Sequence, residues 1–230
     1  HASVMAMTLL GRRMYVYTAL GGIAGVSAED AGRGGLLFAS TIWKPTVAAP
    51  SPVALPGDRI LVTAGYGMGA AILKAREEGG EIRLEEEARI DRSVFACEQH
   101  TPVLFRDRLF TVLPKDAGAL RQQLVCVDLS LQPIWNSGKT LRFGLGPFLV
   151  AGEDILVLDD RGTLTLARAT GDAFEVLESA RVLEGRDAWA PMALASGLLL
   201  LRDSTRMICL DLRAGGGGEH EGPKRPGGEK

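Results

Sequence analysis

The chain has 230 residues, of which 46% are hydrophobic and 23% charged, with a formal net charge of −2 at pH 7. This is the composition of an ordinary globular protein. No apolar stretch approaches the roughly 20 residues of a membrane-spanning helix, and no basic stripe of the kind that binds nucleic acid is present.

One layout of short apolar runs separated by turns recurs five times along the chain. The units run from Ser3 to about Thr41, Pro52 to about Arg92, Thr101 to Trp135, Pro147 to about Val182, and Pro191 to Arg213. The last four units begin at a small residue followed by proline, and successive prolines are 44 to 50 residues apart. A period of about 40–50 residues with four strands in each unit is the signature of β-propeller blades. The sequence therefore predicts an all-β protein, a β-propeller of four-stranded antiparallel blades, with about five blades present.

The first two units show the pattern in order. Strands are predicted at Met14–Tyr17, Gly25–Ala28, Leu36–Phe38, Ile60–Thr63, Ala71–Ala75 and Ile82–Ile90. Between two of them, Gly65–Gly69 resembles a phosphate-binding loop, but it joins two strands and no Lys-Ser/Thr pair follows, so a hairpin loop is predicted. Glu85, Glu86 and Glu87 lie on the predicted outer strand, where charge discourages pairing between sheet edges. They indicate a solvated face and not acid–base chemistry.

The remaining units continue the pattern. Strands are predicted at Val103–Phe105, Leu109–Leu113, Leu124–Asp128, Ile134–Trp135, Ile155–Leu158, Leu164–Ala167, Leu198–Leu201 and Met207–Leu210. Asp159–Gly162 is predicted to be a hairpin turn whose glycine supplies a positive φ.

The layout divides the chain into residues 1–214, the propeller blades, and residues 215–230, a disordered, Gly-rich tail without an apolar anchor. The last unit has three strands, and the chain begins with His1 at the start of a unit. We therefore interpret it as the carboxyl-terminal part of a larger ring. A targeting signal is not visible in it.

The cysteines and histidines do not form a metal-binding pattern. Cys97, Cys126 and Cys209 lie in different units, no Cys-x-x-Cys pair exists, and there are only three histidines. The cysteines are predicted to be small buried hydrophobic residues. No metal site is predicted.

Three segments resemble the repeat of the pyrroloquinoline-quinone (PQQ)-like propeller family, Ala-x-Asp followed by Gly and a closing Trp. They are Ser27–Asp30 with Gly35–Phe38, Cys126–Asp128 with Ile134–Trp135, and Cys209–Asp211, which matches the first part alone. Phe38 stands in place of Trp in the first unit, and the second and fourth units lack the pattern. The resemblance implies a quinoprotein-type propeller in which the closing Trp docks between blades.

The resemblance implies one of two functions. Non-catalytic members, the BamB-like outer-membrane assembly factors, use the ring as a binding scaffold outside the cytoplasm, typically in the periplasm. Quinoprotein dehydrogenases instead hold PQQ and calcium on the propeller axis. The chain lacks the adjacent Cys-Cys pair of many such dehydrogenases and an evident calcium cluster. We therefore expect a non-catalytic protein- or ligand-binding scaffold with no cofactor; the alternative is a fragment of a PQQ-dependent dehydrogenase, with PQQ and calcium as its cofactors.

The candidate binding residues lie in the loops that enter the innermost strands, which in a propeller meet at one mouth of the central channel. These loops carry aromatic and charged side chains, where plain connections would be Gly, Asn or Asp turns. The candidates are Trp43, Lys44, Glu98, Gln99, His100, Arg142, Phe143, Arg186, Asp187 and Trp189. In the competing interpretation, Phe95, Phe143 and Trp189 are plugs between blades, and Arg186 and Asp187 form a structural pair. His100 is interpreted as a hydrogen-bonding residue of the channel and not as a catalytic base, and no catalytic residue is assigned.

Overall fold

The computed structural model describes residues 2–29 and 34–213, and these residues form five antiparallel sheets. The first sheet contains β1 (Met5–Leu9), β2 (Arg12–Ala19), β3 (Gly22–Ser27) and β4 (Leu36–Ser40). The second contains β5 (Val53–Leu55), β6 (Arg59–Ala64), β7 (Gly69–Glu78) and β8 (Glu81–Ile90). The third contains β9 (Val103–Phe105), β10 (Arg108–Val112), β11 (Leu124–Asp128) and β12 (Pro133–Asn136). The fourth contains β13 (Phe148–Ala151), β14 (Asp154–Leu158), β15 (Thr163–Arg168) and β16 (Val176–Arg181), and the fifth contains β17 (Ala193–Ala195), β18 (Leu198–Arg202) and β19 (Met207–Asp211).

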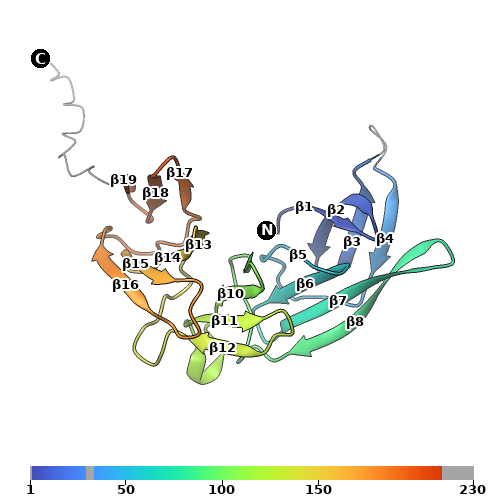
Figure 1. Ribbon diagram of the computed structural model, residues 1–230, viewed down its shortest axis with the longest axis horizontal. Coiled ribbons are helices and arrows are strands. Elements are labelled where there is room, and N and C mark those ends of the chain that lie inside the picture. Colours follow the sequence, from blue (N-terminus) through green and yellow to red (C-terminus); the bar gives the residue numbers. More distant parts are fainter. Residues whose placement is uncertain (1, 30–33, 214–230) are drawn as a thin grey trace, which may run out of the picture.

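Every sheet has up-and-down topology, with strands paired in chain order. The only helical segment among the described residues is a single 3₁₀ turn, Gly118–Leu120 (η1). Figure 1 shows the sheets following one another around an arc that is open between the first and the fifth. The first strands β5 and β9 each lie beside the first strands of both neighbouring sheets, so first strands line the concave side. The predicted all-β blade architecture is confirmed.

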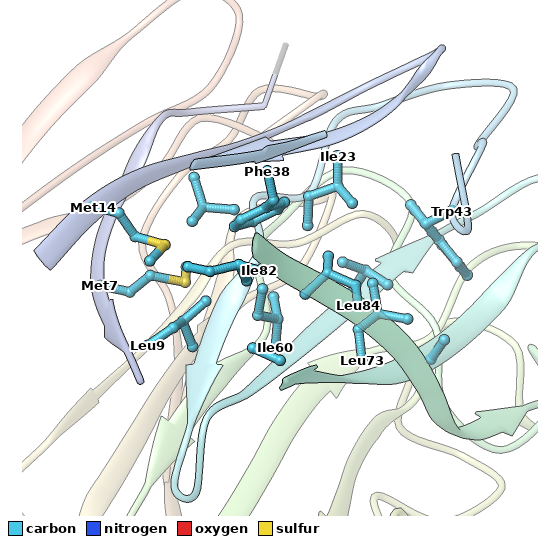
Figure 2. Close-up of a cluster of buried hydrophobic side chains, with 14 of the residues drawn as sticks. Met7, Leu9, Met14, Ile23, Phe38, Trp43, Ile60, Leu73, Ile82 and Leu84 are labelled. Carbon is cyan, nitrogen blue, oxygen red and sulfur yellow. The ribbon is translucent and has the colours of Figure 1, made fainter. Parts of the chain in front are cut away.

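The core consists of four apolar layers, one between each pair of consecutive sheets. Strands of the second, third and fourth sheets are covered on both faces, which explains why runs such as Leu124–Val127 and Ile155–Leu158 are continuously apolar. Figure 2 shows the layer between the first two sheets, where Phe38 of β4 meets Ile82 of β8, and Trp43 lies at its side.

Hydrogen bonds between equivalent positions tie the units together. The N–H of Ser3 donates to Oγ of Ser51 at 2.8 Å, and the N–H of Ser51 donates to Oγ1 of Thr101 at 2.9 Å. Ser3, Ser51 and Thr101 precede the first strands of their sheets. The hydroxyl groups of Ser51 and Thr101 each accept a hydrogen bond from the preceding unit, which explains the small hydroxyl residue before proline. Gly146, at the next equivalent position, has no hydroxyl to accept such a bond.

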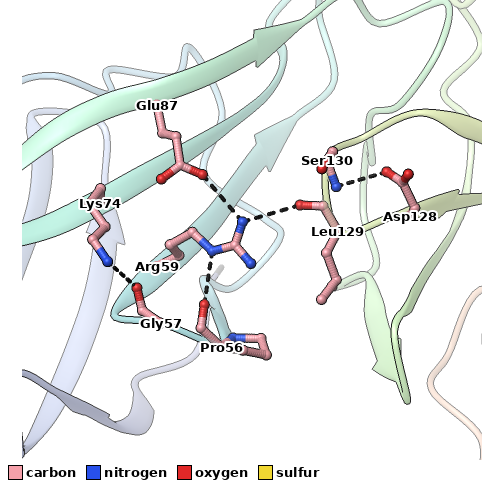
Figure 3. A network of polar contacts seen from close by, with 8 residues as sticks. All are labelled: Pro56, Gly57, Arg59, Lys74, Glu87, Asp128, Leu129 and Ser130. Carbon is pink, nitrogen blue, oxygen red and sulfur yellow. Dashed lines mark hydrogen bonds and ion pairs between the residues drawn. The ribbon is translucent and has the colours of Figure 1, made fainter.

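Polar contacts also join neighbouring sheets at the end away from Ser3, Ser51 and Thr101. Arg59 of β6 donates to the carbonyl oxygen of Pro56, to Glu87 of β8 and to the carbonyl oxygen of Leu129 in the third sheet (Figure 3). Glu87 therefore has a salt-bridge partner at 3.2 Å and remains exposed, as the prediction of a solvated outer strand requires.

A β-bulge on the fourth strand recurs in the first four sheets, and its extra residue is Leu37, Glu87, Ile134 and Leu177 in turn. On the third strand, the last residue before the register shift is Gly25, Ile72, Cys126 and Leu166 in turn. Its partners across to the fourth strand are Phe38, Ala88, Trp135 and Glu178. We call this fourth-strand residue the closing position. It holds a large aromatic side chain in the first and third sheets, and a Cβ on Gly25 would lie 2.3 Å from the Phe38 ring.

The two predicted hairpins are confirmed, whereas the prediction that all three cysteines are buried is wrong for Cys209. Gly67 and Gly162 have φ of 84° and 91°, which an L-residue adopts at a cost. Cys97 and Cys126 are buried as predicted, but Cys209 is exposed. It lies on the face of the fifth sheet that no described sheet covers. The predicted tail, residues 215–230, lies outside the described residues.

Candidate functional site

The candidate loops lie at one end of the sheets because of the strand order. In an up-and-down sheet of four strands, the connections after the second and the fourth strand leave from the same end. The loops between sheets (residues 41–52, 91–102, 137–147 and 182–192) therefore share a face with the β6–β7, β10–β11, β14–β15 and β18–β19 connections. We call this the channel face.

Contacts between three connections join part of this face. Glu98 accepts a hydrogen bond from the backbone N–H of Lys115 at 3.3 Å, and the Lys115 ammonium lies 5.9 Å from the centroid of the Trp189 ring. Glu98 precedes the third sheet, Lys115 lies within it, and Trp189 precedes the fifth. A cation over an indole face at this distance is within the range of a cation–π contact. These residues therefore connect loops of the third and the fifth sheets.

Trp189 has a further feature. Its indole nitrogen is buried and makes no hydrogen bond in the structure, although the residue is partly exposed. An indole N–H usually finds an acceptor when it is buried. An acceptor brought by a partner would remove this cost.

Arg142 and Phe143 have structural partners. The Arg142 guanidinium donates to the carbonyl oxygens of Arg121 and Ala119, the latter at 3.2 Å. The backbone N–H of Phe143 donates to the carbonyl oxygen of Gln122 at 2.7 Å, and its ring is buried in the layer between the third and fourth sheets. The Arg142 side chain is half-buried and holds the β10–β11 loop in place.

His100 is also part of the fold on this face. Its Nε2 contacts the carbonyl oxygen of Leu145, and since a carbonyl can only accept, Nε2 carries the hydrogen. Burial lowers the pKa of His100, against an opposing effect of the Leu145 carbonyl and Asp160. The imidazole is therefore neutral at pH 7 and acts as a hydrogen-bond donor between two loops.

The remaining candidates divide by exposure. Trp43 and Phe95 are fully buried, and the guanidinium of Arg89 lies 5.2 Å from the centroid of the Trp43 ring. Lys44, Gln99, Arg186 and Asp187 are exposed. In this conformation Trp43 and Phe143 cannot contact a partner through their side chains, whereas the exposed residues and the edge of Trp189 can.

Sequence reasoning missed two residues of this face. Lys115 and Asp116 lie on the β10–β11 connection, where Asp116 accepts a hydrogen bond from Gly67 N–H at 2.8 Å and lies 3.4 Å from the Arg92 guanidinium. Polar residues in a loop look like any solvated turn. The topological rule that places this connection beside the loops between sheets could have identified them.

The charged and aromatic groups of this face can make hydrogen bonds, ion pairs and cation–π contacts. Among the described residues, no three His, Cys, Asp or Glu side chains gather where they could hold a metal ion. Calcium takes six to eight oxygen ligands, to which carboxylates, backbone carbonyls and side-chain amides contribute. No helix among the described residues is long and apolar enough to cross a membrane.

Comparison with known proteins supports the fold. No family model and no curated protein matches the chain. Among solved structures, apo AztD from Citrobacter koseri aligns with a TM-score of 0.50 and 10% identity, over 90% of this chain and 69% of that chain. The crystal structure of BamB from Moraxella catarrhalis aligns with a TM-score of 0.45 and 11% identity, over 89% of this chain and 70% of that chain. The likeness to AztD, a β-propeller, confirms the propeller fold; at this identity it shows the fold alone.

Proposed function

We propose that this chain is a non-catalytic β-propeller scaffold that binds a partner, a protein or a ligand, on its channel face. The single observation that carries the proposal is the surface formed by Glu98, Lys115 and Trp189, which come from three different connections. Lys44, Gln99, Arg186 and Asp187 are exposed in the loops of the same face, and the indole N–H of Trp189 has no hydrogen-bond partner in the structure. Aromatic and Arg anchors with a polar rim are the common composition of protein interfaces.

A protein partner suits this surface better than a small molecule. The exposed candidate residues lie on several loops. A protein interface has this form, because many contacts that contribute little surround a few residues that supply most of the binding energy. The resemblance to the PQQ-like family points the same way, since its BamB-like members are scaffolds, and it also suggests a periplasmic or other extracytoplasmic location.

The experiment is site-specific photo-crosslinking in the source cells. A benzophenone amino acid at exposed Gln99 should capture a discrete partner, whereas the same group at Glu85, on the exposed outer strand β8, should not. Equal capture at both positions would contradict a binding site on the channel face.

The quinoprotein alternative has its own test. The protein incubated with PQQ and calcium should gain neither a bound chromophore nor dehydrogenase activity with an artificial electron acceptor. Retention of PQQ through gel filtration at micromolar concentrations would overturn the proposal and would make Glu98 and Asp187 the first candidates for metal ligands.

A further inference from the structure

Five consecutive connections of the channel face each carry an exposed basic side chain. The connections are the β10–β11 loop, residues 137–147, the β14–β15 turn, residues 182–192 and the β18–β19 turn. Their exposed basic residues are, in the same order, Lys115, Lys139, Arg161, Arg186 and Arg206. Among the described residues, none of the five forms an ion pair with a carboxylate, and Arg186 does not pair with its neighbour Asp187.

Hydrogen bonds join each of these connections to the next. The donors are the backbone N–H groups of Phe143, Leu145, Leu183 and Ser204, and the acceptors are, in turn, the carbonyl oxygen of Gln122, the carboxylate of Asp160 and the carbonyl oxygens of Gly162 and Arg186, at 2.7, 2.8, 3.1 and 3.2 Å. The contact between the Lys115 ammonium and the Trp189 ring also joins the first connection to the fourth. The five connections therefore form one continuous surface.

Three carboxylates of the same connections are used within the fold. Asp159 accepts hydrogen bonds from the N–H groups of Arg161 and Thr163 at 2.9 and 2.8 Å, and Asp160 accepts one from the next loop. Asp203 accepts three backbone N–H groups. These acidic groups are directed to the backbone, so the neighbouring basic side chains keep their own donors free.

The opposite end of the third and fourth sheets is arranged differently. Its basic side chains each have a carboxylate partner, at 2.8, 2.8 and 2.7 Å in the pairs Arg106–Glu153, Arg108–Asp172 and Arg168–Asp154. In these sheets, exposed basic groups without an acidic partner are therefore concentrated on the channel face.

We propose that the partner segment that binds the channel face is acidic, with several Asp or Glu side chains that pair with these basic residues. The inference rests on the proposed function and adds the chemistry of the partner. A guanidinium or ammonium group makes a strong, charge-assisted hydrogen bond with a carboxylate. Opposite charges across an interface also speed association and disfavour wrong partners.

A protein segment fits this pattern of charge better than a nucleic acid. Asp160 precedes Arg161 directly, and exposed Asp187 follows Arg186, so positive and negative groups lie close together. One strand of DNA carries a phosphate about every 3.4 Å, and its charges would meet these carboxylates as well as the basic groups. A protein segment can instead place its carboxylates opposite the basic groups alone.

The test uses the full chain and a fluorescein-labelled peptide of Glu-Ser repeats. Its control is a peptide of Gln-Ser repeats, which has the same length and no side-chain charge. In fluorescence anisotropy at about 0.1 M salt, we expect saturable binding of the Glu peptide and at least tenfold weaker binding of the Gln peptide. Binding should be lost at about 1 M salt, where the Debye length is about 3 Å. A labelled oligothymidylate of equal charge should bind more weakly than the Glu peptide.

Variants of the chain locate the site. Arg186→Glu and Arg206→Glu should each weaken binding of the Glu peptide at least threefold. Both should keep the wild-type melting temperature, because neither side chain has a bonding partner in the described part of the fold. The matched control is Arg13→Glu, which makes the same change of charge at an exposed position of β2, at the opposite end of the first sheet. It should bind the peptide as the wild type does.

Three results would overturn the proposal of an acidic partner segment. These are the absence of saturable binding of the Glu peptide, binding of the Gln peptide or the oligothymidylate that is as tight, and equal effects of Arg186→Glu and Arg13→Glu. The proposed function has a separate readout, which is capture of a partner at Gln99. Capture at Gln99 that is the same in the wild type and in Arg186→Glu with Arg206→Glu would leave the channel-face site intact and contradict an acidic segment.

Discussion

At the scale of single residues, the closing position shows how one side chain joins two sheets. Trp135 is 7% exposed, and its ring centroid lies 5.7 Å from that of Phe110 and 5.4 Å from that of Phe174. Its indole N–H donates to the carbonyl oxygen of Gly171 at 3.1 Å, in the fourth sheet's β15–β16 connection. The residue therefore contributes apolar packing and one hydrogen bond to the contact between the third and fourth sheets.

Truncation of the Trp135 side chain should destabilise the fold. We expect Trp135→Ala to lower the free energy of unfolding by about 3–5 kcal/mol, the usual range for a buried Trp. Trp135→Phe should lose less, since it keeps a ring. Urea denaturation gives both values, and a loss below about 1 kcal/mol for Trp135→Ala would show that Trp135 does not fix the two sheets together.

The cysteines give a second test at this scale. Burial raises the pKa of Cys97 to about 11 and that of Cys126 to about 11, so at pH 8 only about one thiol in a thousand is ionised. Cys209 is exposed. Ellman's reagent should therefore modify one thiol rapidly in the native protein and two more only after denaturation. Cys209→Ser should abolish the rapid phase; a rapid phase that persists would place another cysteine at the surface.

At the scale of elements, buried carboxylates fix the turns to the loops between sheets. Asp203, in the β18–β19 turn, accepts hydrogen bonds from the backbone N–H groups of Thr205 and Arg206, both at 2.7 Å, and from Gly185 N–H at 2.9 Å. A Cβ on Gly185 would lie 2.1 Å from the Asp203 carboxylate, so this close approach requires glycine. The turn and the loop before the fifth sheet are thereby held together.

This carboxylate should make stability depend on pH. The Thr205 N–H in the first place, then the Thr205 hydroxyl and the N–H groups of Arg206 and Gly185, lowers the pKa of Asp203 against the effect of desolvation. A lowered acid pKa stabilises the fold above the unfolded-state value, about 3.9, and this contribution is lost as pH falls through the folded-state pKa. Asp203→Asn should lower the melting temperature at pH 7, and the difference should shrink below about pH 4. A difference that does not change with pH would contradict this assignment.

The strands could be predicted because one pattern of apolar residues repeats along the chain. Five copies of one apolar pattern identified the strands, and the Thr-Pro and Ser-Pro entries marked their starts. Whether an individual aromatic residue is buried or exposed could not be predicted in this way, because Trp43, Phe143 and Trp189 occupy similar loops and differ only in tertiary contacts. Cys126 and Cys209 likewise hold equivalent strand positions, and only the presence of a following sheet decides which of them is buried. Lys115 could have been found from topology, although not from its residue type.

At the scale of the whole molecule, both ends of the arc present apolar sheet faces. On the fifth sheet, Leu200 is 44% exposed and Met207 65% exposed; on the first, Tyr15 is 46% exposed and Tyr17 38% exposed. By strand register, these positions correspond to buried residues of the interior sheets. An exposed apolar sheet face is an association surface. We therefore propose that further sheets cover both faces, as the interpretation of a larger ring requires.

This arrangement predicts the behaviour of the 230-residue chain alone. It should bind a hydrophobic dye such as ANS and self-associate, and replacement of both Leu200 and Met207 with Glu should reduce both effects without loss of the native circular dichroism spectrum. Sedimentation velocity measures the association. A wild-type chain that remains a monomer and binds no dye would contradict the open arc and favour a closed five-bladed ring.

The central claim, recognition of a partner at the channel face, is tested most directly by the affinity of the partner captured at Gln99 for three forms of the chain. These are the wild type, Trp189→Ala and, as a control on the outer strand, Glu85→Ala. We predict that Trp189→Ala weakens binding by more than about 1 kcal/mol, or roughly fivefold in Kd, with the melting temperature showing that the chain is folded. Glu85→Ala should bind as the wild type does. Equal affinity of folded Trp189→Ala and wild type would contradict the claim.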